Sequence, residues 1–287
     1  MNRKATWFDY VNVLILMLVV VICLYPFIYM IAVSMSGGGP ISQGKVWLYP
    51  VDFNLDMYRY VFEDGRILTG YKNTLIYVAL GTACSLLVTV LGAYPLSKKQ
   101  MVFQKPIMLM IVLTMFINGG MIPTFLVVRG LGLLDSIWAM VLPGLISTWN
   151  LIIMRTFFLG IPKELEESAK VDGLSDIGIL FKIVLPISQA VIASVGLFYA
   201  VGIWNGFMSP LLYLRSEELY PLQLFLRNIV LSSEMTGSGA PVSGNIVVVE
   251  PAMKYAAIII STLPILCVYP FLQKYFVKGV TLGSVKG

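Results

Sequence analysis

Residue types that commonly carry catalysis or bind metals are sparse in this chain of 287 residues. Histidine is absent, which removes histidine metal ligands, histidine general bases and Ser-His or Cys-His nucleophile pairs. Cys23, Cys84 and Cys267 lie separately in apolar runs and form no CxxC pair. No phosphate-binding GxxxxGK[ST] loop, HExxH, calcium-binding loop or GxSxG motif occurs. The sequence therefore predicts no catalytic residue, no metal site and no cofactor of its own.

The most informative spacing lies between Leu159 and Pro186. Pro162 suits the first turn of a helix, where its missing N–H group costs nothing. Acidic residues near that N-terminus complement the helix dipole; they are Glu164, Glu166 and Glu167. Asp172-Gly173 then ends the helix with a glycine cap.

A second short helix is predicted after the glycine, with Ser175 as its N-cap. Its apolar residues recur at helical spacing and predict one buried face, formed by Ile177, Leu180, Phe181 and Val184. Two short helices meeting at a sharp turn suit insertion into a groove on a partner protein. The alternative is a helix pair lying on lipid, although three glutamates disfavour close contact with an anionic leaflet.

The elements that position this segment are predicted to span a membrane. The chain is 58% hydrophobic and 12% charged, with a mean hydropathy of +0.85, whereas a soluble domain has about 25% charged residues. A crossing helix needs about 20 apolar residues. Six charge-free windows meet this length: 11–36, 73–97, 106–128, 136–154, 186–214 and 255–273. We expect an all-α, polytopic protein with one transmembrane domain over residues 1–287, and the net charge of +5 requires no nucleic acid.

Lysine and arginine placement predicts the orientation, because cytoplasmic flanks are enriched in both. One set of span ends carries a concentrated group: Arg3, Lys4, Lys98, Lys99, Lys105, Arg155, Lys163, Lys170, Lys182, Lys274, Lys278 and Lys286. The opposite ends carry fewer, spread over longer loops and mixed with acidic residues. Both termini and the 159–186 loop are therefore predicted to be cytoplasmic. The first apolar run is too long for a signal peptide and is expected to be retained.

No predicted span contains Asp, Glu, Lys or Arg. Ion-coupled carriers commonly place such groups at membrane depth, so energy for uphill transport is expected from another subunit. Four amides lie inside the spans as candidate pathway residues: Asn118, Asn150, Gln189 and Asn205. Hydrogen bonding between helices explains them equally well.

The outer loop before the last predicted span is rich in small residues. It runs through Thr236, Gly237, Ser238, Gly239 and on to Asn245. It is either a connector or a probe that reaches into a partner's binding cleft.

The cytoplasmic segment resembles the EAA loop of binding-protein-dependent ABC importer permeases, which reads E-A-A-x(3)-G-x(9)-I-x-L-P. Glu167, Ser168 and Ala169 occupy the E-A-A positions, with serine in place of the first alanine. Gly173 follows at the family's spacing, and Leu185-Pro186 close the motif. The motif also lies before the penultimate span, as it does in this family.

Three further elements resemble the carbohydrate, maltose-type permeases, and the smaller permease subunit in particular. Asn73-Thr74-Leu75 opens the second span, and Trp204-Asn205-Gly206-Phe207 lies in the fifth. The tail from Lys274 to Gly287 resembles that of the smaller maltose permease. The likeness covers nearly the whole chain.

The resemblance implies the type I ABC importer permease fold in a prokaryotic cytoplasmic membrane. A homologous second permease, two ATPase subunits that bind ATP, and an extracellular sugar-binding protein would be its partners. The coupling residues would be Glu164, Glu167, Ser168, Ala169, Asp172, Gly173, Leu185, Pro186 and Lys278. Glu167 would face a basic residue of the ATPase, and the 236–245 loop matches the position of the loop that enters the binding protein.

Within the family, the Met121–Phe125 stretch looks most like permeases for complex or acidic oligosaccharides such as pectin or alginate fragments. Lys72, Arg129 and Arg215, near the outer span ends, would attract uronates, although such residues usually only face water. The sequence leaves two other classes of protein as alternatives. One is a secondary carrier or channel subunit, and the other is a membrane enzyme, which the missing motifs disfavour.

Overall fold

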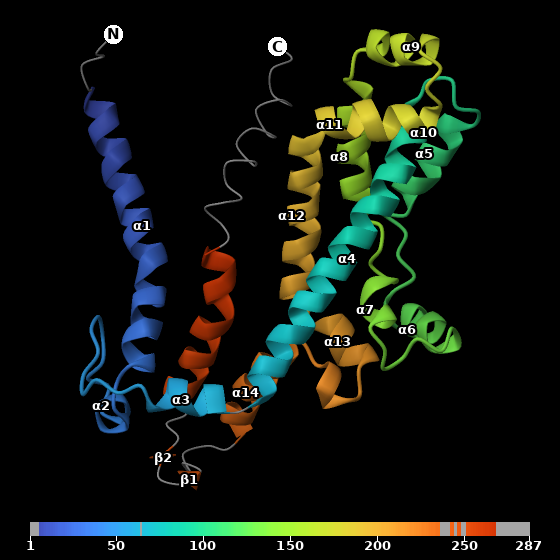
Figure 1. Ribbon diagram of the computed structural model, residues 1–287. Helices are drawn as coiled ribbons and strands as arrows, with labels where there is room; N and C mark the ends of the chain where they lie inside the picture. Colours follow the sequence, from blue (N-terminus) through green and yellow to red (C-terminus); the bar gives the residue numbers. More distant parts are fainter. Residues whose placement is uncertain (1–5, 64, 236–241, 244–245, 248–250, 268–287) are drawn as a thin grey trace. The chain divides into compact units, whose positions relative to one another are not determined.

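The computed structural model is predominantly helical, as the sequence predicted (Figure 1). It describes residues 6–63, 65–235, 242–243, 246–247 and 251–267. These residues fall into two compact units. The first takes its described residues from Met1–Leu68 and Phe225–Pro264, and the second from Thr69–Leu224 and Ile265–Gly287.

The first unit contains one long apolar helix, α1 (Trp7–Ser34), together with shorter elements. The shorter helices and strands are α2 (Gly38–Ser42), α3 (Asp56–Glu63), most of α14 (Leu222–Met235), β1 (Val242–Ser243), β2 (Ile246–Val247) and most of the helix Pro251–Cys267. The two strands are antiparallel, with Val242 opposite Val247.

Helix α1 is apolar around its whole circumference. No residue in its most apolar 18-residue window is buried within the chain. A helix without a polar face is typical of a membrane span. Its last turn alone is buried, at Ala32, Val33 and Ser34; there the Ser34 hydroxyl lies 2.8 Å from the Tyr58 hydroxyl, and Tyr29 meets Tyr255 edge-on at 6.1 Å.

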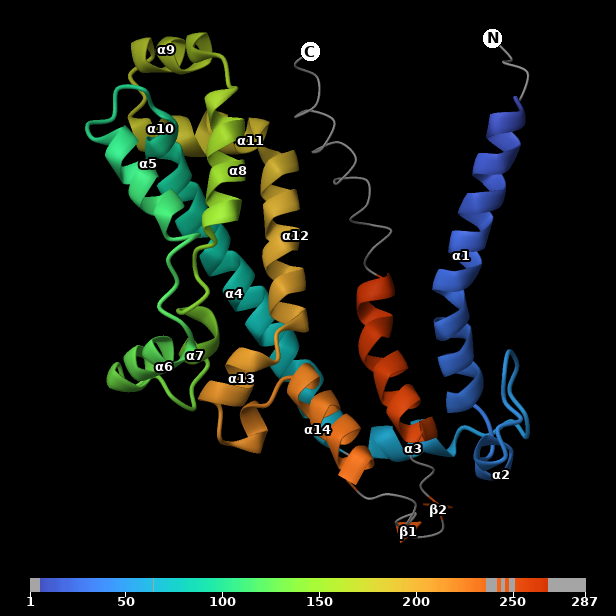
Figure 2. The ribbon, with the colours of Figure 1, turned by 180° about the vertical axis from the view of Figure 1, so that it is seen from behind.

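The second unit holds the segments that the sequence singled out. Its elements are α4 (Gly65–Ser97, from Thr69), α5 (Gln104–Leu113), α6 (Met121–Gly130), α7 (Trp138–Val141), α8 (Thr148–Leu159), α9 (Lys163–Val171), α10 (Asp176–Ile179), the π-helix Leu180–Val184, α11 (Leu185–Ile187), α12 (Gln189–Asn205), α13 (Met208–Tyr213) and the 3₁₀ turn Glu217–Leu219. Helices α9 and α10 lie at one end of this unit, and α6, α7 and α13 at the other (Figures 1 and 2).

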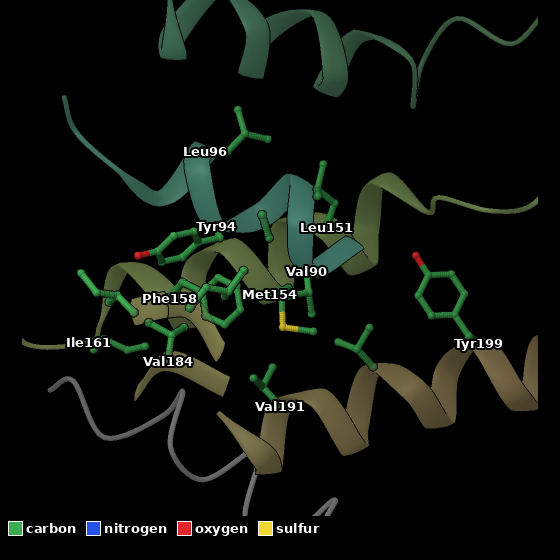
Figure 3. Packing of buried hydrophobic residues seen from close by; sticks show 14 of the residues in the cluster. Val90, Tyr94, Leu96, Leu151, Met154, Phe158, Ile161, Val184, Val191 and Tyr199 are labelled. Carbon is green, nitrogen blue, oxygen red and sulfur yellow. The ribbon is translucent and has the colours of Figure 1, made fainter. Parts of the chain in front are cut away.

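The core of the second unit forms where α4, α8, the π-helix and α12 meet (Figure 3). Met154, Ile179, Val184 and Val195 are each fully buried there. Tyr94 packs edge-on against Phe158, with ring centroids 6.4 Å apart. This tight packing connects the α9 end of the unit to the long helices, because buried side chains cannot shift independently.

The chain bends sharply where the predicted fifth span begins. Residues Asp176–Ile187 and Gln189–Asn205 form a helix pair bent by 84°, at Ser188, which is fully buried. The predicted apolar face before the bend is partly wrong. Leu180 and Val184 are buried, but Ile177 is 70% and Phe181 51% exposed. Phe181 lies in a π-helix, where the 3.6-residue period no longer applies; Ile177 lies in α10, where Ile179 is the buried residue.

Three predicted spans are not continuous helices, because the 186–214 window breaks between α12 and α13 at Gly206-Phe207 as well as bending at Ser188. The 106–128 window divides into α5 and α6, separated by Asn118-Gly119-Gly120, where Gly120 has φ +86°. The 136–154 window divides into α7 and α8 around Pro143-Gly144. Proline and glycine interrupt helices because one lacks an N–H group and the other is conformationally free.

Length and composition mark two described helices, α1 and α4, as able to cross a membrane, and the bent pair as a third. The six-span count and the single domain over 1–287 remain predictions.

Candidate functional site

Helix α9 forms as the sequence predicted and carries the EAA-like residues. Pro162 precedes it as N-cap residue, and Glu164 and Glu166 lie in its first turn. Ser175 caps α10, accepting a hydrogen bond from the Gly178 N–H at 3.2 Å. The two short helices expected between Leu159 and Pro186 are therefore present.

The turn between them depends on Gly173, which has φ +80°. Its N–H donates to the Lys170 carbonyl at 3.0 Å, and the Leu174 N–H donates to the Ala169 carbonyl at 3.0 Å. This pair of bonds is the Schellman motif that ends many helices. A Cβ at this position would meet no atom within 4 Å, so the requirement for glycine comes from the left-handed backbone rather than from crowding.

The EAA-like residues divide into one that is buried and several that are exposed. Ala169 is 3% exposed and packs in the core of the second unit. Glu164, Glu167, Ser168, Asp172 and Gly173 are exposed. Val171 is 88% exposed, an unusual placement for valine at a helix end. Leu185 packs partly against the core, and Pro186 is exposed. Helix α9 is thus anchored through its small residue and presents its polar face outward.

One acidic residue of α9 has a role that the sequence did not reveal. Glu166, expected to be exposed, forms an ion pair with Lys98 at the end of α4. The two side chains are only 19% and 27% exposed, and the Lys98 ammonium lies 4.1 Å from the Tyr94 ring centroid. A half-buried ion pair that also contacts an aromatic face is screened less than a surface pair. It fixes α9 to the end of α4.

The same end of α4 is tied to two more helices. The Leu96 carbonyl accepts hydrogen bonds from Arg155 Nε at 2.8 Å and from Gln104 Nε2 at 2.6 Å. The carbonyl is left without its helical partner because the following residues leave the helix. On the other side of the turn, Lys170 Nζ lies 3.0 Å from Asp176 Oδ1; hydrogen bonding to Asp176, together with its charge, raises the pKa of Lys170.

Of the four candidate pathway amides, Asn150 alone lines a described cavity. This cavity, of about 570 Å³, lies in the second unit among α4, α7, α8, α12 and α13. Asn118 is exposed and accepts a hydrogen bond from the Gly120 N–H. Gln189 is exposed at the start of α12, and Asn205 donates to the Val201 carbonyl of its own helix.

The family-like Asn73-Thr74 pair has a structural role. Asn73 Nδ2 donates to the carbonyls of Glu218 and Tyr220, at 2.7 and 3.1 Å. The Thr74 hydroxyl accepts from the Leu222 N–H at 2.9 Å. These bonds fasten the segment after α13 to α4 and form part of the wall behind the cavity.

Asp135 makes a second attachment at this end. Its carboxylate accepts from the N–H groups of Arg215 and Ser216, each at 2.9 Å, and from the Ser216 hydroxyl at 2.5 Å. These hydrogen bonds lower the pKa of Asp135. They join loops that lie 80 residues apart in the sequence, which no local pattern predicts.

Two groups of predicted site residues lie outside the described residues. One is the candidate binding-protein loop, with Thr236, Gly237, Ser238, Gly239 and Asn245. The other is the tail with Lys278. Their roles stay predictions.

Comparison with known proteins agrees with these features. A family model described as "Binding-protein-dependent transport system inner membrane component" matches residues 90–282. The chain belongs to this family, and is therefore a non-catalytic membrane permease subunit of an ABC importer, as the EAA-like spacing indicated. Membership implies an ATPase and a substrate-binding protein as partners, and an inner-membrane location.

Individual similar proteins align with this chain over nearly its whole length. It is 45% identical to "Protein LplC" of Bacillus subtilis, over 100% of this chain and 97% of that protein. It is 46% identical to the "Polygalacturonan/rhamnogalacturonan transport system permease protein YtcP" of the same organism, over 99% and 100%. A crystal structure of a bacterial ABC transporter involved in importing the acidic polysaccharide alginate contains a similar chain, with a TM-score of 0.89, 33% identity and coverage of 96% and 100%.

Proposed function

We propose that this chain forms half of a membrane pathway that imports acidic oligosaccharides. The observation that carries the proposal is the chemistry named for two similar proteins. One is named for polygalacturonan, a polymer of a sugar acid, and the other belongs to a transporter for acidic alginate. Lys72, Arg129 and Arg215 are exposed and would attract uronate carboxylates before entry, because oppositely charged groups raise local solute concentration.

The complex would contain a homologous second permease and two ATPase subunits, with an extracellular protein that delivers the sugar. ATP would be bound by the ATPase subunits, and this chain would need no cofactor. Six spans would place both termini in the cytoplasm, on the same side as α9. The loop that includes Thr236 and Asn245 would reach the binding protein, and the tail that includes Lys278 would run into the ATPase interface.

Helix α9 would be the contact through which ATP-driven movement reaches the pathway. Its anchored side holds Ala169 and Glu166, while Glu167 and Val171 face outward. A movement applied to α9 would pass along the π-helix into α12, because one buried cluster includes residues of all three elements. Glu167 would pair with a basic residue of the ATPase groove.

The test is substrate-stimulated ATP hydrolysis by the purified assembly with its matching binding protein. We expect trigalacturonate to stimulate hydrolysis and uptake, and maltotriose to have little effect. Stimulation by maltotriose and not by trigalacturonate would contradict the acidic substrate. Purification of the chain alone, with transport driven by an ion gradient, would contradict the ATP-driven complex.

A further inference from the structure

The cavity beside Asn150 has the size and lining of a small-molecule site. Its volume of about 570 Å³ lies in the range of about 300–1,000 Å³ that is common for ligand pockets. Its wall is contributed by α4, α7, α8, α12 and α13, which lie together in the second unit (Figure 1). None of the side chains that line it is charged.

Asn150 provides the polar recognition group. The residue is 5% exposed and lines the cavity. Its backbone N–H donates to the Ser147 hydroxyl, but no hydrogen bond joins its side-chain amide to any other residue that the structure describes. The amide is not among the fully enclosed polar atoms that lack a partner in the described residues, so it is reached from the cavity. The amide can donate two hydrogen bonds and accept more, so a ligand with several hydroxyl groups would satisfy it.

Trp149 provides an aromatic surface next to this amide. It is 61% exposed, although it lines the same cavity. The face of an indole ring carries negative charge density, which attracts the weakly positive C–H groups on one side of a sugar ring. An exposed aromatic ring beside a buried amide thus matches a sugar, which has both C–H faces and hydroxyl groups.

The wall around these two residues is held in place by neutral hydrogen bonds. The Tyr199 hydroxyl lies 2.8 Å from the Thr89 hydroxyl and accepts from the Ser147 N–H at 3.0 Å. The Tyr77 hydroxyl donates to the Leu219 carbonyl at 2.7 Å. Fixed groups lose little entropy when a ligand binds. The wall is therefore preorganised, and Asn150 keeps its hydrogen-bonding capacity for a ligand.

From these features we infer that the cavity is a sugar-ring subsite, in which Trp149 stacks on the ring and the Asn150 amide binds its hydroxyl groups. The inference deepens the proposed function and rests on it. A uronate carboxylate would find no cationic side chain here. The first turn of α8 offers only the roughly half charge of a helix N-terminus, which Ser147 already caps. The subsite therefore recognises the ring and not the acid group.

Space for the ring is left at Gly202, which also lines the cavity. A Cβ added there would meet no atom within 4 Å. Gly202→Phe would fill the cavity, and phenylalanine is a better helix former than glycine, so the helix itself should not be weakened. Gly39→Phe is the matched control, because Gly39 is equally unobstructed and lines no described cavity.

The experiment measures uptake of trigalacturonate and of its fully methyl-esterified form by the complete assembly in proteoliposomes. Trp149→Ala and Asn150→Ala should each raise KM about 2- to 12-fold, by the same factor for both sugars, with basal ATP hydrolysis and co-purification of the other subunits retained. Gly202→Phe should abolish uptake of both. The controls are Gly39→Phe and Trp47→Ala, the latter a similarly exposed tryptophan of the first unit, and both should behave as wild type.

Four results separate the possible failures. Unchanged KM in both Trp149→Ala and Asn150→Ala would overturn the subsite. Loss of the second permease from the purified Trp149→Ala complex would also overturn it, since Trp149 would then be an interface residue. A KM increase confined to the acidic sugar would also overturn it. If the wild type imports only maltotriose, the acidic substrate of the proposed function is wrong, and the same variants measured with maltotriose decide the role of the cavity.

Discussion

Two cavities in the second unit have about the same volume, about 570 Å³ each, but opposite linings. The cavity at the α9 end is bordered by seven charged residues: Lys98, Lys99, Lys163, Glu166, Glu167, Lys170 and Asp176. The cavity at the α13 end is bordered by none. The same helices, α4 and α8, therefore border a charged cavity at one end and an uncharged cavity at the other.

The difference shows how each end holds its parts in place. At the α9 end, a half-buried ion pair and hydrogen bonds to one carbonyl attach α9, α8 and α5 to α4. Around the cavity at the α13 end, hydroxyl groups make neutral bonds, and the Asp135 carboxylate binds the Arg215–Ser216 loop outside the cavity lining. Charges suit a surface that docks on a charged partner, whereas neutral groups leave a sugar free to pass without tight binding.

The largest expected effect comes from breaking the turn at the charged end. Gly173→Pro cannot adopt φ +80°, because proline fixes φ near −65°. We expect loss of ATPase docking and of uptake, with membrane insertion intact. Gly173→Ala, which can reach the left-handed region at a cost of about 1–2 kcal/mol, should keep partial uptake. Co-purification and uptake assays measure both, and normal transport by Gly173→Pro would count against the coupling role.

Loss of the ion pair that holds α9 to α4 should have the next largest effect. Lys98→Met leaves Glu166 partly buried without its cation and should cost about 1.5–3 kcal/mol in stability, with reduced coupling of hydrolysis to uptake. Thermal unfolding of the purified complex measures the first effect, and the ratio of sugar imported to ATP hydrolysed the second. Glu166→Gln in the Lys98→Met background should add little. Fully additive effects of the two substitutions would show that the pair does not act as a unit.

The neutral end should respond more weakly to loss of one hydroxyl. Tyr199→Phe removes the bonds to Thr89 and to the Ser147 N–H, and Thr89 is fully buried. We expect a loss of about 1–2 kcal/mol, with coupling unchanged, because α9 is not attached there. Reduced coupling with unaltered thermal stability would contradict this separation of the two ends.

Substitution of Asp135 should have the smallest effect, and this effect should depend on pH. Hydrogen bonds from Ser216 and Arg215 lower the pKa of this carboxyl, so it stabilises the loop above the pKa of the unfolded chain, about 3.9. That contribution is lost as pH falls through the lower folded value. The protection of the Arg215 and Ser216 amides against hydrogen exchange, relative to their intrinsic rates at each pH, should fall in acid in the wild type. Asp135→Asn should remove most of that pH dependence, and an unchanged pH profile in this variant would exclude the mechanism.

Local features of the coupling segment were predictable from the sequence. Pro162, Gly173 and Ser175 act through bonds to neighbours a few residues away, so their spacing alone indicates a cap or a turn. The register of the following helix was not predictable in the same way, because the π-helix at Leu180–Val184 departs from the 3.6-residue period and leaves Phe181 exposed. Pro186, which cannot donate to the Lys182 carbonyl four residues before it, lies just after this wider turn.

Contacts between distant segments could not be predicted from the sequence. Lys98 and Glu166 are 68 residues apart, and each alone looks like a solvated charge. Among four similar amides, only the fold distinguishes Asn150, which lines the cavity, from Asn205, which bonds to its own helix. An ion pair of Lys98 with the acidic loop could have been expected, because a lysine at the end of a span, near Tyr94, is well placed to meet that loop. The sequence could not show which of the three glutamates is its partner.

The most direct test of the account is the contact made by α9 in the assembled transporter. Val171 is 88% exposed in that helix, and a photo-crosslinking residue placed there reports what lies against it in native membranes. We predict an adduct with the ATPase subunit, which weakens when Gly173→Pro is added. An adduct with lipid alone, or no adduct with the ATPase in an actively transporting complex, would contradict the claim that ATP-driven movement enters this chain through α9.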